Sequence, residues 1–115
     1  MDKIRPAVPL FSLYERTGDS CYIRALHQEI KQLETHPRTK EGGYWHKKIY
    51  PHQMWLDGIF MASPFMEEYA KMFEQPQWFD EAVRQITLIY DRTLDARTGL
   101  LYHAWDESKT QRWAN

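Results

Sequence analysis

The chain has 115 residues and a mass of 13.9 kDa, which is enough for one domain with a modest core. Its 15 basic and 16 acidic residues give a formal net charge of −1, which argues against a nucleic acid or an anionic membrane as a partner held by bulk charge. The sequence has no membrane-length apolar run, no apolar signal-peptide core and a single cysteine, Cys21. These features predict a cytoplasmic protein without a membrane partner.

The first two predicted elements form a helical hairpin. Apolar residues recur at helical spacing from Ala7 to Tyr14, and Gly18 ends that pattern. Asp19 or Ser20 can cap a second helix, which His36-Pro37 closes because a residue before proline disfavours the helical region. The apolar positions of the second helix form one stripe: Tyr22, Ile23, Leu26, Ile30 and Leu33.

The third predicted helix is unusually apolar. Gly42-Gly43 marks a tight turn, and residues 44–50 read as an extended loop or a short hairpin. Pro51 fits the first position of a helix, since its missing N–H has no helical partner there. From Met54 to Met66 most residues are apolar, which predicts a helix buried on all sides, and Pro64 should kink or split it.

The last predicted helix begins at Pro76, and turn chemistry at 95–99 and an extended segment at 100–105 follow it. Residues 14–25 and 73–82 resemble each other. Each contains the end of a helix, a tight turn and the start of a second helix with aromatic-x-x-Ala, at Tyr22 and at Phe79. This weak repeat predicts stacked helical hairpins and an all-α fold. The stripe of the last helix is Phe79, Val83, Ile86 and Tyr90, with Ala82 and Ile89 beside it.

Two carboxylates lie in surroundings that are unusual for a charge. Asp57 falls among apolar residues, one predicted helical turn after Gln53, and an unpaired carboxylate there costs several kcal/mol. It either caps a helix beginning at Gly58, pairs with a lysine such as Lys47 or Lys48, or forms the floor of a pocket with Gln53 as its neighbour.

Asp106 follows Trp105 in a turn-like setting, where desolvation would raise its pKa and make it a general acid. The alternatives are a helix N-cap or an exposed turn aspartate. Two carboxylates beside tryptophans are typical of chemistry on a sugar. A metal site is the weaker alternative, since the candidate ligands lack His-x-x-x-His or Cys-x-x-Cys spacing. Those ligands would be His46, His52, His103 and Asp57.

Two long motifs resemble signatures of one enzyme family. Residues 42–58, GGYWHKKIYPHQMWLDG, and residues 99–108, GLLYHAWDES, are similar to segments of the unsaturated rhamnogalacturonyl hydrolases of glycoside hydrolase family 105, relatives of family 88. The resemblance runs from about Leu10 to the last residue. It implies an (α/α)6 barrel that acts on pectin-derived oligosaccharides ending in a 4,5-unsaturated uronic acid, by hydrating the double bond.

The resemblance also implies roles for individual residues. Asp106 matches the general acid and base that protonates C4 and activates water, and Asp57 matches the second active-site aspartate. No metal or organic cofactor takes part in the implied reaction. The residues expected to bind the oligosaccharide are Tyr44, Trp45, His46, Gln53, His103 and Trp105.

The sequence departs from the family pattern in two ways. Pro9 stands where the family has a helical stretch containing tryptophan and glycine, and the chain stops at Asn115, before the later hairpins. Residues 1–115 are therefore expected to be the N-terminal portion of a barrel. The alternative is a truncated, non-catalytic helical module that binds sugars or self-associates, and an exposed apolar helix predicts a homodimer.

Overall fold

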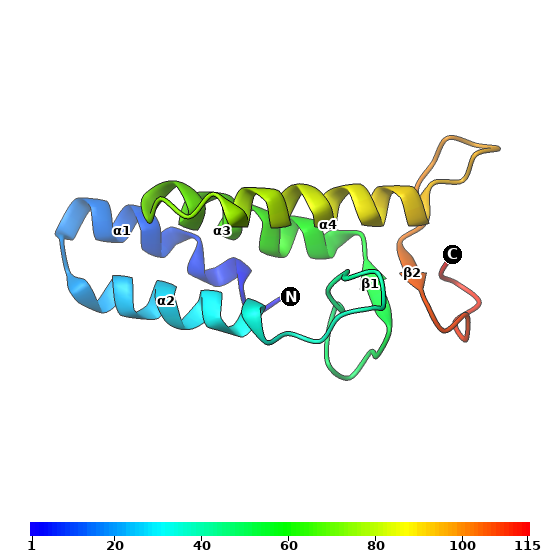
Figure 1. Cartoon of the computed structure of the whole chain (residues 1–115), viewed down its shortest axis with the longest axis horizontal. Coiled ribbons are helices and arrows are strands. Elements are labelled where there is room, and N and C mark those ends of the chain that lie inside the picture. The colour runs from blue at the N-terminus through cyan, green and yellow to red at the C-terminus, as the bar shows by residue number, and fades with distance from the viewer.

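Four α-helices and a two-stranded β-ribbon make up the fold (Figure 1). The computed structural model describes all residues, 1–115. A short 3₁₀ helix at Arg5–Ala7 precedes the first hairpin, and the two hairpins lie side by side in an elongated molecule of 50 × 27 × 20 Å. The elements are α1 (Pro9–Thr17), α2 (Ser20–Glu34), β1 (Gln53–Trp55), α3 (Asp57–Met72), α4 (Gln77–Thr93) and β2 (Ala104–Asp106).

The mostly helical fold class is confirmed, and the full barrel stays a prediction. None of the helices combines the length and the apolar character that crossing a membrane demands. The main core lies between the 3₁₀ helix, α1, α2 and α3 and includes Phe11, Leu26, Phe65 and Met66, each at most 3% exposed. A smaller cluster of Met54, Ile89 and Trp105 fills the space between the ribbon and α4.

The first hairpin has the boundaries that its capping residues predict. Gly18 ends α1 with φ at 67°, and its N–H donates to the carbonyl of Tyr14. The Oδ1 atom of Asp19 then accepts from the N–H of Cys21 at 2.8 Å and caps α2. The sequence predicts these helix ends because the two partners of each capping hydrogen bond are at most four residues apart.

The prediction of a third helix starting at Pro51 is wrong. Pro51 lies in a turn, Gln53 belongs to β1, and α3 begins only at Asp57. β1 is held by backbone hydrogen bonds to β2, which lies about 50 residues later in the chain. The local sequence pattern does not predict a partner so distant. Gln53 and Asp57 therefore do not share a helical face.

Two further expectations for α3, a split at Pro64 and burial on all sides, are wrong, whereas a kink at Pro64 stays a prediction. The helix passes through Pro64 without a break, with Phe65 and Met66 completely buried beside it. It is not buried on all sides, because the ring of Phe60 is 57% exposed and lies 4.3 Å below the guanidinium of Arg5. One face of α3 provides the core contacts and the opposite face meets solvent.

Helix α4 begins where the sequence predicts, directly after Pro76, but it buries a different face. The expected stripe of Phe79, Val83, Ile86 and Tyr90 is between 38% and 62% exposed. Ala82 and Ile89 are buried as expected against α3, where the small side chain of Ala82 permits a close approach of the two helices. The full buried set is Trp78, Ala82, Gln85, Ile89 and Thr93.

Candidate active site

The β-ribbon sorts the candidate side chains onto two faces. β1 and β2 are antiparallel, with Gln53 opposite Asp106 and Met54 opposite Trp105. Because side chains alternate along a strand, Gln53 and Asp106 share one face and Trp105 lies on the other. Trp105 is 6% exposed and packs with Met54 and Ile89, so the structure places it in the core.

Asp106 is completely buried and is saturated with hydrogen bonds. Its Oδ1 atom accepts from the N–H and hydroxyl of Ser108, at 2.9 and 2.6 Å. Its Oδ2 atom accepts from the N–H and hydroxyl of Thr110 and from the N–H of Gln111, at 2.9, 3.0 and 2.9 Å. The carboxylate thus holds residues 107–111 in place.

These contacts overturn the expectation that the pKa of Asp106 is raised. Burial alone would raise it, but the hydrogen bonds from Ser108, Gln111 and Thr110 favour the charged form and lower the pKa to about 2. Asp106 is therefore an ionised carboxylate near neutral pH in this arrangement. The donors come from the turn that follows β2, which the sequence pattern did not reveal.

Asp57 is the first residue of α3, where the helix dipole favours a negative charge. Its side chain is 42% exposed overall, but its Oδ1 atom is buried and has no hydrogen-bond partner. That oxygen lies 3.9 Å from Nδ1 of His46. Asp57 thus has one oxygen that can still bind a donor, which Asp106 lacks.

His46 connects Asp57 to the start of the chain. Its ring is 2% exposed, and Nε2 lies 3.1 Å from Oδ1 of Asp2. If Nε2 carries the hydrogen that this contact requires, Nδ1 is an acceptor that faces Oδ1 of Asp57. Burial lowers the pKa of His46, which keeps the imidazole neutral.

An aromatic cluster surrounds Trp55. The ring of His46 stacks on the indole at 4.4 Å and that of Tyr50 at 5.0 Å, nearly parallel in both cases. His103 and the perpendicular Trp113 lie 5.3 and 5.5 Å from the indole, measured between ring centroids. Sequence reasoning found His46 and His103 but missed Trp55, Tyr50 and Trp113 as one cluster, because it placed Trp55 in a buried helix.

Gln53 belongs to the same part of the ribbon. Its Oε1 atom accepts from the indole N–H of Trp55 at 3.1 Å, and its carbonyl accepts from the N–H of His46 at 2.7 Å. The side chain is therefore tied to the aromatic cluster rather than to Asp57. It fixes the ring of Trp55 relative to β1.

The side chains of Tyr44 and Trp45 contact other protein side chains. Tyr44 is 4% exposed, its hydroxyl accepts from Arg38 at 2.8 Å, and burial raises its pKa. The ring of Trp45 lies 4.8 Å from that of His52, and its buried indole N–H has no partner. Of the candidate site residues, His46, Gln53, Asp57, His103 and Asp106 lie in the ribbon or beside it, while Tyr44 and Trp105 pack into cores.

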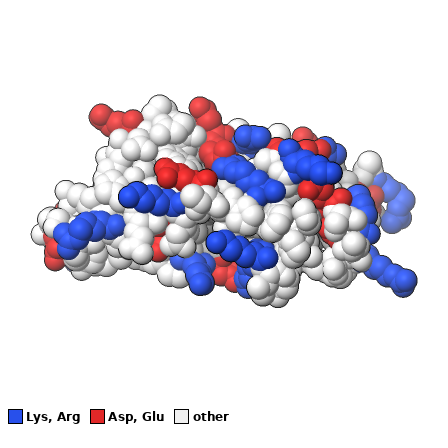
Figure 2. Space-filling view, turned by 60° about the horizontal axis from the view of Figure 1, so that its bottom comes forward, with Lys and Arg blue, Asp and Glu red and all other residues white.

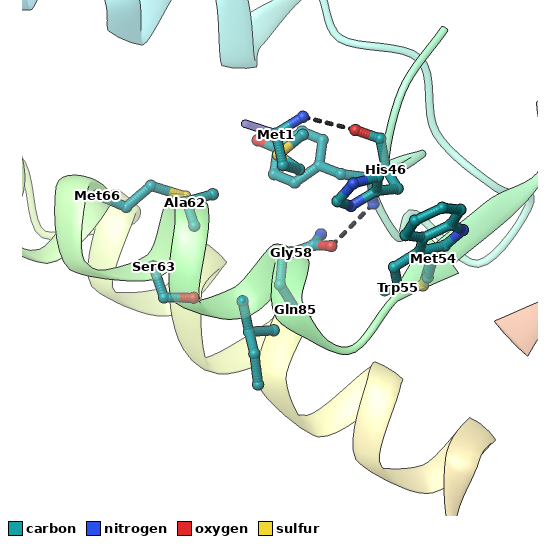
Figure 3. Close-up of a pocket in the computed structure, with 11 residues that line it drawn as sticks. Met1, His46, Met54, Trp55, Gly58, Ala62, Ser63, Met66 and Gln85 are labelled. Carbon is teal, nitrogen blue, oxygen red and sulfur yellow. Dashed lines mark hydrogen bonds between the residues drawn. The ribbon is translucent and has the colours of Figure 1, made fainter. Parts of the chain in front are cut away.

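A small cavity of about 20 Å³ lies beside His46 (Figure 3). It is large enough for one water molecule, and two side chains in its wall, His46 and Ser63, have a buried polar atom without a partner. At its edge the amino group of Met1 donates to the carbonyl of His46 at 2.5 Å. No set of three or more His, Cys, Asp or Glu side chains is placed to hold a metal ion.

Comparison with known proteins shows the family to which the chain belongs. The model of Glycosyl Hydrolase Family 88 matches residues 1–115. The unsaturated rhamnogalacturonyl hydrolase YesR of Bacillus subtilis is 32% identical over 103 residues, which are 84% of this chain and 30% of YesR.

Solved structures of similar proteins contain the same fold over the matched residues. A family 105 glycoside hydrolase of Clostridium acetobutylicum superposes with a TM-score of 0.93 at 45% identity, over 99% of this chain and 32% of that one. A possible family 105 member from Klebsiella pneumoniae gives 0.82 at 29% identity, over 90% and 28% of the two chains. The chain thus spans about a third of the length of these relatives, and it belongs to glycosyl hydrolase family 88.

Proposed function

We propose that residues 1–115 are part of an (α/α)6 hydrolase that acts on oligosaccharides ending in a 4,5-unsaturated uronic acid. The reaction is the hydration of the double bond, after which the sugar linkage breaks. The observation that carries the proposal is that two aspartates, Asp57 and Asp106, flank the same ribbon as the aromatic cluster around Trp55. The family match and the similarity to YesR support the substrate class.

The proposed chemistry needs a proton at C4 and a water molecule at C5. Protonation of the vinyl ether leaves a cation stabilised by the ring oxygen, and the attack of water gives a hemiketal that opens and releases the neighbouring sugar. One carboxyl group that gives a proton and then takes one from water suffices, so no cofactor enters. We assign this role to Asp106, following the resemblance, and a supporting role to Asp57.

The hydrogen bonds of Asp106 set a condition for that role. A carboxyl group with five donors holds a proton poorly, so Asp106 can act as an acid only if residues 107–111 release some of those donors when substrate binds. The hydroxyls of Ser108 and Thr110 can rotate away more readily than the backbone N–H groups. As a base toward water, Asp106 is already in the required ionised form.

A turnover assay tests the proposal. The chain is incubated with an unsaturated rhamnogalacturonyl disaccharide, and the ultraviolet absorbance of the double bond is followed. We expect slow loss of absorbance that Asp106→Asn abolishes, because general acid–base catalysis is worth roughly 10²–10⁴ in rate. Asp91→Asn, at an exposed position of α4, is the matched control and should leave the rate unchanged.

The second candidate is a non-catalytic helical module that binds sugars. The saturated hydrogen bonding of Asp106 favours it. Binding of the disaccharide without turnover, equal in the parent chain and Asp106→Asn, would establish this alternative. We place either form in a reducing cytoplasm, where the exposed thiol of Cys21 stays free.

A further inference from the structure

A second, much larger cavity lies outside the candidate active site. It has a volume of about 520 Å³ and is formed by residues 1–4, the last turn of α2 and residues 47–49. That volume lies within the range of small-molecule sites, roughly 300–1,000 Å³. Ile49, which is 74% exposed, provides an accessible apolar part of its wall.

The cavity carries an excess of positive charge. Lys3, Lys47 and Lys48 line it together with a single carboxylate, Asp2. Asp2 is fully engaged, since Oδ2 lies 2.6 Å from Nζ of Lys47 and Oδ1 lies 3.1 Å from Nε2 of His46. Neither Lys3 nor Lys48 forms an ion pair, so two ammonium groups are free to bind an anion.

This excess is local. Figure 2 shows acidic and basic side chains interspersed over the face it displays, and the whole chain has a net charge of −1. A general attraction for polyanions is therefore not expected. The ligand must instead place its negative charge inside the cavity.

The remaining wall suits a polyhydroxylated ligand. Nε2 of His36 donates to the carbonyl of Trp45 at 2.7 Å, and burial lowers the pKa of His36, so its other ring nitrogen is a neutral acceptor. Gln32 uses its amide N–H on Glu29 and keeps its Oε1 atom free as a second acceptor. A hydroxyl-bearing ring can donate to both, whereas a small inorganic anion would neither fill the volume nor use the apolar wall.

We propose that this cavity binds a carboxylated sugar, with Lys3 and Lys48 on the carboxylate and the sugar ring against Ile49. The choice of a uronate rests on the proposed function, in which Asp57 supports the reaction at Asp106, because an oligosaccharide that contacts Asp57 can extend toward the cavity. Asp2 links the two places, since it contacts both Lys47 in the cavity wall and His46 beside Asp57. The site would hold an acidic unit of the oligosaccharide that does not react.

An NMR titration with saturated digalacturonate tests the proposal, because this probe has no double bond and is not turned over. We expect the amide signals of residues 2–4, 32–36 and 47–49 to shift, with a dissociation constant that rises severalfold between about 0.02 and 0.15 M salt, where screening shortens from over 20 Å to about 8 Å. Cellobiose, a neutral disaccharide, should shift them much less. Equal shifts with cellobiose would overturn the role of the lysines.

Charge reversal provides the matched control. Lys3→Glu with Lys48→Glu should weaken digalacturonate binding at least tenfold, whereas Lys40→Glu with Lys71→Glu makes the same change of net charge at exposed positions outside the cavity and should have little effect. If Lys3→Glu with Lys48→Glu disturbs the fold, the neutral pair Lys3→Gln with Lys48→Gln replaces it and should also weaken digalacturonate binding. Equal weakening by both charge reversals, shifts confined to Trp55 and Trp113, or no shifts at all would each refute the site. Turnover of an unsaturated substrate is measured separately, so its failure bears on the proposed function alone.

Discussion

Asp106 shows how a single residue can have both a structural and a proposed chemical role. It joins the ribbon to the turn of residues 107–111 through two side-chain hydroxyls and three backbone N–H groups. In Asp106→Asn the new NH2 group would face donors, so at least one contact becomes repulsive. We expect the free energy of unfolding to fall by about 1.5–3 kcal/mol, measured by urea denaturation. The control Asp91→Asn should change it by no more than about 0.5 kcal/mol.

The same hydrogen bonds predict the acid stability of the chain. The pKa of Asp106 falls from an ordinary value of 3.8 to about 2 on folding, so the carboxylate stabilises the folded chain above about pH 4. This contribution, on the order of 2 kcal/mol, is lost as the pH falls toward 2. Denaturation curves at pH 5, 4, 3 and 2 should therefore converge for the parent chain and Asp106→Asn. A constant difference between the two proteins over this range would contradict the assignment.

His46 gives a prediction about a proton. Burial lowers its pKa, so the ring should be neutral at pH 7, with its hydrogen on Nε2 toward Asp2. Long-range ¹H–¹⁵N NMR spectra report both the tautomer and the titration. Asp2→Asn should raise the population of the other tautomer, whereas a ring that is charged at pH 7 or carries its hydrogen on Nδ1 would show that His46 is oriented by Asp57 instead.

At the scale of single residues, the sequence names candidates but does not predict their surroundings. The two motifs single out Asp57, His46 and Asp106. The direction of the pKa shift of Asp106 depends on the backbone of Ser108, Thr110 and Gln111, whose orientation is a property of the folded turn. Proximity to Trp105 suggested desolvation, but Trp105 lies on the opposite face of the ribbon.

Among the elements, the sequence predicts the ends of helices well and their partners poorly. Gly18, Asp19 and Pro76 act on neighbours a few residues away, and the helix boundaries beside them are correct. β1 exists only through pairing with β2, so the local pattern favoured a helix. In α4 two apolar sets occur at helical spacing, and packing against α3 selects the one that contains Ala82.

The close approach of the loop to β1 predicts the effect of a methyl group at Gly43. A Cβ atom there would lie 2.0 Å from Sδ of Met54 and 3.0 Å from Cδ2 of Leu88. Gly43→Ala should therefore lower the free energy of unfolding by about 1–3 kcal/mol, as overpacking typically does. Combining it with Met54→Ala should cost less than the sum of the two single changes, because the clash is removed. Additive effects in urea denaturation would show that Met54 moves aside at no cost.

For the whole molecule, the orientation of α4 changes which surface is expected to form the homodimer interface. Phe65 and Met66 of α3 are completely buried, whereas α4 exposes a stripe of four large apolar residues, Phe79, Val83, Ile86 and Tyr90. The radius of gyration is 15.3 Å, against about 13 Å for a compact domain of about 100 residues. An elongated shape leaves more surface unburied, and the four residues of this stripe follow one another along a single helix face.

We propose that a second copy of the chain covers this stripe, in a weak two-fold dimer. Full burial of a large apolar side chain is worth about 1.5–3 kcal/mol, and these four are already about half buried. Burying the stripes of two copies then contributes on the order of 8 kcal/mol to the free energy of association. At least about 4 kcal/mol of this is offset by the loss of translational and rotational freedom. The net value corresponds to a dissociation constant of about 1 mM.

Sedimentation from about 0.05 to 2 mM, a range that brackets this constant, should therefore show a rising mean mass. Val83→Lys should abolish the rise, because a charge would be buried at the centre of the stripe. Gln77→Lys adds the same charge at an exposed position on a different side of α4 and should leave it unchanged. A constant 13.9 kDa across the range would mean that the stripe stays in water. Equal behaviour of the two variants would place the contact on another face of the molecule.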